Sequence, residues 1–205
     1  KLGVGARIEI IRSGEVIPKL EKVIKPAKKI VIPNTCPACG AKVTWENDNI
    51  LCTNKKTCPA QQETALRYFF KTLGSADGFG PKSLETLVSN GHTSIPAIFA
   101  LKQKDFSDMG FGDKQSENFE QALQTAIKTP VEDARFLASF AIPNLAIGSA
   151  RALLKHHPFE TLADLTVKDF VAIDGFAEKT GTTISETLQK RWSEIEQICK
   201  LGFNL

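Results

Sequence analysis

The pattern of hydrophobic and polar positions divides the chain into a short β-rich segment followed by a long helical one. Hydrophobic residues partly alternate with polar ones over residues 7–12 and again over 16–25, which predicts strands joined by a turn at residues 13–15. Prolines at positions 18, 26 and 33 restrict these strands to short or edge positions. Two or three strands cannot close a barrel, so we expect the last part of a β domain whose earlier strands are absent.

From residue 61 onward, hydrophobic positions follow helical spacing, and a short unit recurs between helices. The unit is a small residue, a hydrophobic residue, a second small residue and then a helix. Its copies begin at Gly78, Gly110, Asn144 and Gly175, in steps of 32, 34 and 31 residues. A nearly fixed period with one helical hairpin per step predicts a repeat array. We therefore expect the last two-thirds of the chain to be entirely helical.

Two connectors carry residues that favour the start of a helix. Thr129, Pro130 and Glu132 place a threonine at the N-cap, a proline at the first helical position and a glutamate at the third. Thr166 followed by Asp169 is a weaker example of the same pattern. We expect helices to begin immediately after Thr129 and after Thr166.

Four cysteines are spaced as two close pairs ahead of the helical region. Two residues separate Cys36 from Cys39, twelve separate Cys39 from Cys52, and five separate Cys52 from Cys58. Four thiolates suit tetrahedral Zn²⁺, and a site with four protein ligands has no open position for catalysis. Two disulfides or a redox-active Cys-x-x-Cys are the alternatives. Disulfide frameworks are typical of small secreted proteins, and the redox motif requires a βαβ context, so we favour structural zinc.

Each recurring hairpin has the chemistry of a phosphate-binding turn. Small residues allow a tight turn and close approach of another backbone, and the next helix presents its N–H groups at once. Such main-chain contacts do not depend on base sequence. The alternative is a hairpin whose glycine only ends a helix and whose lysine is solvated. The hairpins lie near 78–82, 110–114, 144–148 and 175–179, and the predicted DNA-binding residues are Gly78, Gly80, Lys82, Gly110, Gly112, Lys114, Ala146, Gly148, Gly175, Ala177 and Lys179.

The last two hairpins depart from the pattern of small residues. Asn144 and Ala146 replace both glycines in the third copy, and Ala177 replaces the second glycine in the fourth. Asparagine tolerates a left-handed backbone, whereas alanine does not adopt it readily. We therefore expect weaker phosphate contacts at the third and fourth hairpins than at the first two.

Charge and composition add three expectations. The net charge is +3, but residues 1–33 carry eight Lys or Arg against three Asp or Glu, which favours an anionic partner. No hydrophobic run reaches the roughly 18 residues of a membrane helix, and no secretory leader is visible, so we expect a cytoplasmic protein with no membrane partner. The helical arginines are interpreted as surface charges, the three histidines as loop or surface residues and Cys199 as a core residue. These arginines are Arg67, Arg135, Arg151 and Arg191.

The order of these features resembles the NAD⁺-dependent DNA ligases of bacteria. The resemblance rests on residues 4–6 and 12–18, on the run Cys36-Pro37-Ala38-Cys39-Gly40, and on the hairpins as far as residues 201–203. It implies the end of an oligonucleotide-binding (OB) domain, a zinc finger and four helix-hairpin-helix motifs, which clamp nicked double-stranded DNA for replication and repair. It also implies a monomer associated with the nucleoid. NAD and Mg²⁺ are then expected in the parent enzyme only.

The predicted fold is mainly α, with three parts. We expect a partial OB-fold over residues 1–33, the four-cysteine zinc finger over 34–60 and the helix-hairpin-helix domain over 61–205. The chain contains no Lys-x-Asp-Gly adenylation motif and its only methionine is Met109, so we predict a piece of a longer enzyme with no catalytic residue of its own. Two other interpretations stay open, a helix-hairpin-helix module of another repair protein such as a nuclease, and a protein-interaction scaffold.

Overall fold

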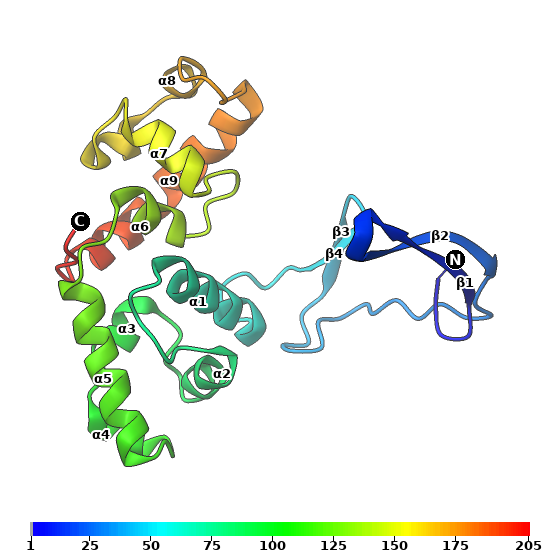
Figure 1. Cartoon of the computed structure of the whole chain (residues 1–205), viewed down its shortest axis with the longest axis horizontal. Coiled ribbons are helices and arrows are strands. Elements are labelled where there is room, and N and C mark those ends of the chain that lie inside the picture. The colour runs from blue at the N-terminus through cyan, green and yellow to red at the C-terminus, as the bar shows by residue number, and fades with distance from the viewer. Residues whose placement is uncertain (1) are drawn as a thin grey trace. The chain divides into compact units, whose positions relative to one another are not determined.

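The computed structural model describes residues 2–205, which form two compact units joined in sequence between Lys55 and Lys56 (Figure 1). The first unit contains the strands and the second contains all the α-helices of the described chain. The prediction of a mainly α fold with a small β segment is therefore confirmed. The finer division at residues 33 and 60 stays a prediction.

The first unit holds two antiparallel hairpins. Strands β1 (Arg7–Ser13) and β2 (Ile17–Lys25) are joined by the short 3₁₀ turn η1 (Gly14–Val16), as the alternating pattern predicts. Strands β3 (Val43–Glu46) and β4 (Asn49–Cys52) form the second hairpin. A two-stranded ribbon has too little surface to bury its apolar side chains. Several large apolar residues of the first hairpin are accordingly exposed, namely Ile10, Val16, Ile17 and Ile24.

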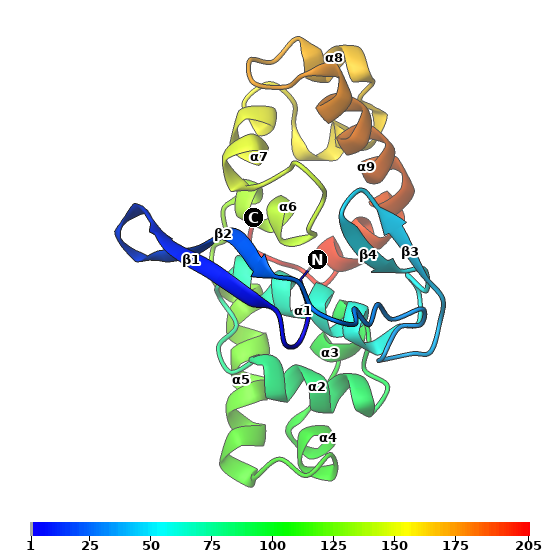
Figure 2. The ribbon, with the colours of Figure 1, turned by 90° about the vertical axis from the view of Figure 1, so that its right-hand side faces the viewer.

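The second unit consists of nine helices and one 3₁₀ segment within the described residues. Helices that flank each predicted hairpin contact one another, as do α1 and α6. Figures 1 and 2 show α2 to α5 toward one end of this unit and α7 and α8 toward the other. The elements are α1 (Pro59–Leu73), α2 (Pro81–Ser89), α3 (Ile95–Phe99), α4 (Gln103–Asp108), α5 (Asp113–Lys128), α6 (Asp133–Ser139), α7 (Ile147–Leu154), η2 (Phe159–Asp164), α8 (Val167–Val171) and α9 (Glu178–Cys199).

One continuous apolar core extends through the second unit, from Leu66 to Phe203. Aromatic rings link its parts. The Phe70 ring of α1 stacks on Phe79 of the first hairpin with their centroids 4.4 Å apart, and Phe136 of α6 lies 5.1 Å from Phe203. Burial of apolar side chains such as these rings is the dominant favourable term in folding. The core therefore fixes the positions of the hairpins.

The helix predicted to start at Pro130, directly after Thr129, starts three residues later, at Asp133. Thr129 ends α5 in an extended conformation, and Glu132 is the N-cap of α6. A residue that precedes proline is disfavoured in the helical region, which suits the extended Thr129. The N–H of Val131 instead donates to the carbonyl of Asn204 at 2.8 Å. Val131 and Asn204, in the C-terminal tail, are 73 positions apart along the chain, so no local sequence pattern could predict this contact. The start predicted after Thr166 is confirmed, since α8 begins at Val167.

Arg135 and Arg191 are half-buried and contact helix ends, so their interpretation as surface charges is wrong, whereas the exposed Arg67 and Arg151 agree with it. Arg135 donates to the Thr72 carbonyl at the end of α1 at 3.2 Å, and Arg191 donates to the Phe140 carbonyl at the end of α6 at 2.6 Å. Arg151 of α7 forms a paired contact with both carboxylate oxygens of Glu132. The last carbonyls of a helix have no helical partner, so an arginine is favourable there.

No helix among residues 2–205 combines the length and the apolar character needed to cross a membrane.

Candidate zinc centre and nucleic-acid interface

The four cysteines that the sequence singles out converge in space. Their sulfur atoms all lie within 4.8 Å of one another, with Cys36 and Cys58 buried and Cys39 and Cys52 half-buried. The β3–β4 hairpin carries Cys52 at its end, while Cys58 is the N-cap residue of α1. The Cys39 and Cys52 sulfurs are 3.5 Å apart, well beyond the roughly 2.05 Å of a disulfide bond.

A tight turn prepares the first cysteine pair for a cation. Gly40 adopts a left-handed φ of 71°, and its N–H donates to the Cys36 carbonyl at 2.8 Å. Backbone N–H groups of Ala38 and Cys39 point at the Cys36 sulfur. Their hydrogen bonds lower the pKa of this thiol to about 7. The turn therefore stabilises the thiolate, which is the form that binds a metal.

The four sulfurs fit zinc. A tetrahedral ion with Zn–S bonds of about 2.3 Å requires sulfur atoms about 3.8 Å apart, which is compatible with this cluster. Four thiolates are also the ligand type that favours zinc or an iron–sulfur cluster over magnesium or calcium. The cluster can thus hold a metal, and the sequence prediction of the four ligands agrees with the geometry.

All four predicted hairpins share one backbone geometry. The first small residue of each has a left-handed φ of 91° at Gly78, 90° at Gly110, 65° at Asn144 and 93° at Gly175. The hydrophobic residue that follows contacts the core in each copy, namely Phe79, Phe111, Leu145 and Phe176. Asparagine is among the few residues besides glycine that adopt this conformation readily. Asn144 thus preserves the turn.

The second small residue is the N-cap of the next helix and does not require glycine. Its φ is −83° at Gly80, −66° at Gly112, −78° at Ala146 and −77° at Ala177, all ordinary extended values. A Cβ atom added at Gly80 or Gly112 would meet no protein atom within 4 Å. The expectation that the alanines weaken the third and fourth turns through backbone strain is therefore wrong.

Helical hydrogen bonding starts at the same offset in every copy. The N–H six positions after the left-handed residue donates to the N-cap carbonyl, at 3.0, 2.9, 2.8 and 2.9 Å in order along the chain. The donors are Leu84, Ser116, Ala150 and Gly181. The three residues before each donor have no helical acceptor for their N–H groups. Pro81 has no N–H, so α2 presents two such groups and the other helices present three.

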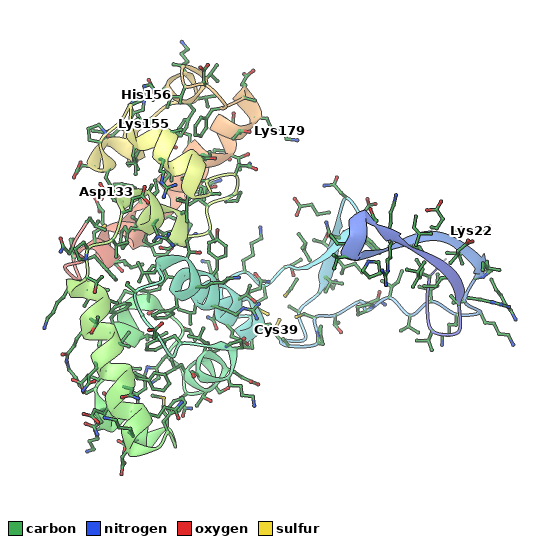
Figure 3. All side chains as sticks on the ribbon, in the orientation of Figure 1. Lys22, Cys39, Asp133, Lys155, His156 and Lys179 are labelled. Atoms are coloured by element: carbon green, nitrogen blue, oxygen red, sulfur yellow. The ribbon has the colours of Figure 1, made fainter. Side chains whose placement is uncertain are left out.

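The predicted lysines lie at the second position of their helices, but they differ in their partners. Lys114 forms an ion pair with Glu117 at 2.8 Å, and this hydrogen bond lowers the pKa of the Glu117 carboxyl. Within residues 2–205, Lys82 and Lys179 form no ion pair, and the Lys179 side chain extends away from the helices (Figure 3). Gly148 occupies the corresponding position of α7 and supplies no cation.

Comparison with known proteins identifies relatives over the full length of the chain. A protein named DNA ligase from Psychromonas ingrahamii is 45% identical over 204 residues, which cover 100% of this chain and 31% of that protein. Proteins of the same name are 44% identical in Desulfatibacillum aliphaticivorans, over 99% of this chain and 32% of the relative, and 42% identical in Shewanella baltica, over 100% and 31%. This chain is homologous to one portion of the DNA ligases. No protein-family model matches it.

The chain spans 31–32% of the length of these DNA ligases. The resemblance to a portion of a DNA ligase is therefore confirmed, and it favours this family over a nuclease or a scaffold. The four clustered cysteines and all four predicted hairpins lie within the matched region, because the alignment with the Psychromonas protein covers the whole chain.

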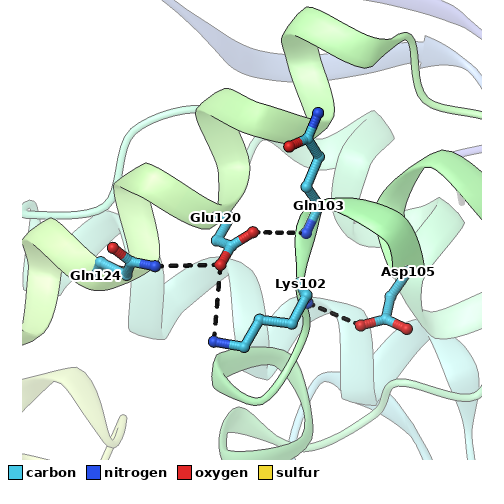
Figure 4. A network of polar contacts seen from close by, with 5 residues as sticks. All are labelled: Lys102, Gln103, Asp105, Glu120 and Gln124. Carbon is cyan, nitrogen blue, oxygen red and sulfur yellow. Dashed lines mark hydrogen bonds and ion pairs between the residues drawn. The ribbon is translucent and has the colours of Figure 1, made fainter.

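One residue that positions the second hairpin has no signal in the sequence. The carboxylate of Glu120 on α5 accepts from the Gln103 N–H at 2.8 Å and lies 3.7 Å from the Lys102 ammonium (Figure 4). Gln124 donates to the same carboxylate at 3.1 Å. Glu120 thereby accepts a hydrogen bond from a backbone N–H at the start of α4 and links α4 to α5, on the other side of the hairpin. Gln103 and Glu120 are 17 positions apart, so no helical spacing relates them.

Proposed function

We propose that this chain is the part of an NAD⁺-dependent DNA ligase that binds nicked double-stranded DNA during replication and repair. One observation carries the proposal: four hairpins present backbone N–H groups at the same offset after a left-handed residue. Homology to DNA ligases over the full chain supports the choice of DNA as the ligand.

The hairpins bind phosphates through their backbone. Unsatisfied N–H groups and the positive end of the helix dipole both favour a phosphate oxygen. Lys82, Lys114 and Lys179 add cations beside three of these turns, although Lys114 must exchange its Glu117 partner for a phosphate. Phosphate contacts fix the position of a protein on DNA without reading bases. The chain is expected to bind duplexes of any sequence.

The cysteine cluster holds a structural zinc ion. When bound, zinc supplies folding free energy to a segment whose few apolar side chains cannot hold it together. Four protein ligands leave no position for a reacting water, so the cluster takes no part in chemistry. Cys58 is also the N-cap residue of α1, which places the metal site directly before the first hairpin helix in the sequence.

Catalysis belongs to other parts of the parent enzyme. The nucleophilic lysine, NAD and Mg²⁺ act there, because this sequence contains no Lys-x-Asp-Gly motif. Residues 1–33 contribute the end of the OB domain, which grips the DNA together with the hairpins. We expect the chain to be monomeric and to work beside the chromosome, without sealing nicks or becoming adenylated by itself.

Fluorescence anisotropy tests the proposal with nicked and intact duplexes of several unrelated sequences. We expect dissociation constants on the order of 10⁻⁶ M at physiological salt, similar for all sequences and weaker as salt rises. A titration with a fluorescent acidic peptide of equal charge serves as a control for attraction to any polyanion. Absence of binding to every duplex, with the protein shown to be folded by circular dichroism, would overturn the assignment.

A further inference from the structure

A basic cavity lies beside the first hairpin. It has a volume of about 540 Å³ and is lined by the turn residues Gly78 and Gly80 and by Arg67 and Lys71 of α1. Arg67 and Lys71 are exposed and four positions apart on one face of the helix. The hydrophobic residues Leu66, Phe69, Phe70 and Leu73 of α1 face the core.

Arg67 differs from the other helical arginines. Arg135, Arg151 and Arg191 each bind a carbonyl or a carboxylate of the protein. Across residues 2–205, neither Arg67 nor Lys71 forms an ion pair through its side chain, and Asp77 is the one carboxylate in the cavity lining. Two cations against one carboxylate leave the lining with a net positive charge. Lys71 lies in the last turn of α1, where a cation also interacts favourably with the helix dipole, whereas Arg67 lies before that turn.

A cavity at the fourth hairpin provides the contrast. It has a similar volume of about 440 Å³, but Lys168 and Glu178 balance each other in its lining and the remaining residues are Val167, Val171 and Ala172. The hairpin geometry therefore does not by itself create a basic cavity. The net positive charge of the cavity lining at the first hairpin comes from Arg67 and Lys71 of α1.

We propose that Arg67 and Lys71 bind the DNA backbone across this cavity and extend the phosphate contacts of the first hairpin onto α1. Residues four apart on a helix have Cβ atoms about 6 Å apart, and the DNA backbone presents charges at short, regular intervals, so both cations can bind one strand together. Arginine can in addition bind a phosphate through two parallel hydrogen bonds. This inference rests on the proposed function, because it assigns further residues to the same DNA-binding surface.

The test compares four variants of the full chain by anisotropy on one nicked duplex across a salt series. Arg67→Gln and Lys71→Gln should each reduce affinity about eightfold at roughly 0.1 M salt and lower the slope of log K against log salt by about 0.9. Arg67→Lys should restore most of the slope, because it restores the charge. Lys168→Gln, in the balanced cavity, is the matched control and should leave the slope nearly unchanged.

The outcomes separate this inference from the proposed function. Thermal melting checks that every variant is folded, which is expected because both side chains are exposed. Binding by the unmodified chain together with unchanged affinity and slope in Arg67→Gln and Lys71→Gln would overturn the inference alone. Equal losses in those variants and in Lys168→Gln would also overturn it, since any positive charge would then have the same effect. Failure of the unmodified chain to bind any duplex would overturn both.

Discussion

Two glycines of the same hairpin are under different constraints. Gly78 has a φ of 91°, and a Cβ atom there would lie 3.0 Å from Cε1 of Phe119. Gly80, two positions on, has a φ of −83° and open space around the position of a Cβ atom. Gly78 is thus required by the turn and by packing against α5, whereas the fold does not require glycine at position 80. Any requirement for glycine at position 80 would therefore come from a ligand that approaches the hairpin, and not from the fold.

Stability measurements on alanine variants test this distinction. Gly78→Ala should lower the free energy of unfolding by about 2 kcal/mol or more, from the left-handed backbone and the close Phe119 contact. Gly80→Ala should change it by less than about 0.5 kcal/mol. Urea denaturation followed by circular dichroism measures both. If the two variants show equal losses, the turn does not have the conformation described above.

At the scale of single residues, the sequence predicts where the important residues lie better than it explains their roles. The four cysteines and the start of every hairpin could be located from spacing alone, because metal ligands and left-handed turns restrict residue type strongly. The role of the second small residue could not be predicted from the sequence, since glycine also occurs where the backbone has a negative φ that any residue can adopt. Ala146 and Ala177 are informative there: they occupy the N-cap position without a positive φ.

The distance between paired helices depends on a few close contacts. Gly181 of α9 lies so near α8 that an added Cβ atom would be 2.8 Å from Cβ of Phe170. Gly148 occupies the second position of α7, and a Cβ atom there would meet nothing within 4 Å. Gly148 is the second residue of α7 and Gly181 the fourth residue of α9, so both lie in the first turn of a hairpin helix and compare an open position with a crowded one.

Alanine at these two positions should have opposite effects on stability. Gly181→Ala should destabilise the protein by about 1–3 kcal/mol, because α8 and α9 must move apart. Gly148→Ala should stabilise it by about 0.4–1 kcal/mol, because alanine reduces the conformational freedom of the unfolded chain at no steric cost. Shifts in the urea midpoint at constant m-value measure the difference. Stabilisation by Gly181→Ala would show that α8 and α9 are not in close contact.

Element boundaries follow the sequence where their causes are local and depart from it where distant groups intervene. The start of α8 agrees with its local signal, since the Asp169 carboxylate accepts from the Thr166 N–H at 2.8 Å. The start of α6 does not, because Val131 bonds to the C-terminal tail at Asn204. The Arg135 and Arg191 contacts also join residues 63 and 51 positions apart. Such long-range partners leave no periodic signal in the sequence.

The second unit has two halves with the same order of elements. In the first half, α1 and α2 enclose one hairpin and α4 and α5 the next, with α3 between them; α6, α7, η2, α8 and α9 repeat this order. The repeat extends to a detail at the start of α4 and α8. Asp105 accepts from the Lys102 N–H at 2.8 Å, as Asp169 does from Thr166. A pair of hairpins with its intervening segment is therefore the repeating unit, and the period of about thirty residues is half of it.

The two units of the molecule differ in what stabilises them. The helical unit has an extensive apolar core, whereas the segment around the cysteines has little buried apolar surface among its described residues. A bound metal should therefore determine whether residues 34–58 fold and should have little effect on the stability of α2 to α9. We expect elemental analysis to find about one zinc ion per chain after purification without chelators.

Removal of the metal should consequently unfold one part of the chain and spare the other. Structural zinc contributes about 10–16 kcal/mol of apparent binding free energy, which becomes folding free energy when the site forms only in the folded state. A strong chelator, or Cys36→Ser, should abolish amide protection over residues 34–58 and fray the first turn of α1, where the Gln61 and Gln62 N–H groups bond to the Cys58 carbonyl. Helical circular dichroism should change little. Cys199→Ser, outside the cluster, is the control for loss of a thiol. Unchanged hydrogen exchange over 34–58 after complete chelation would show that this segment folds without a metal.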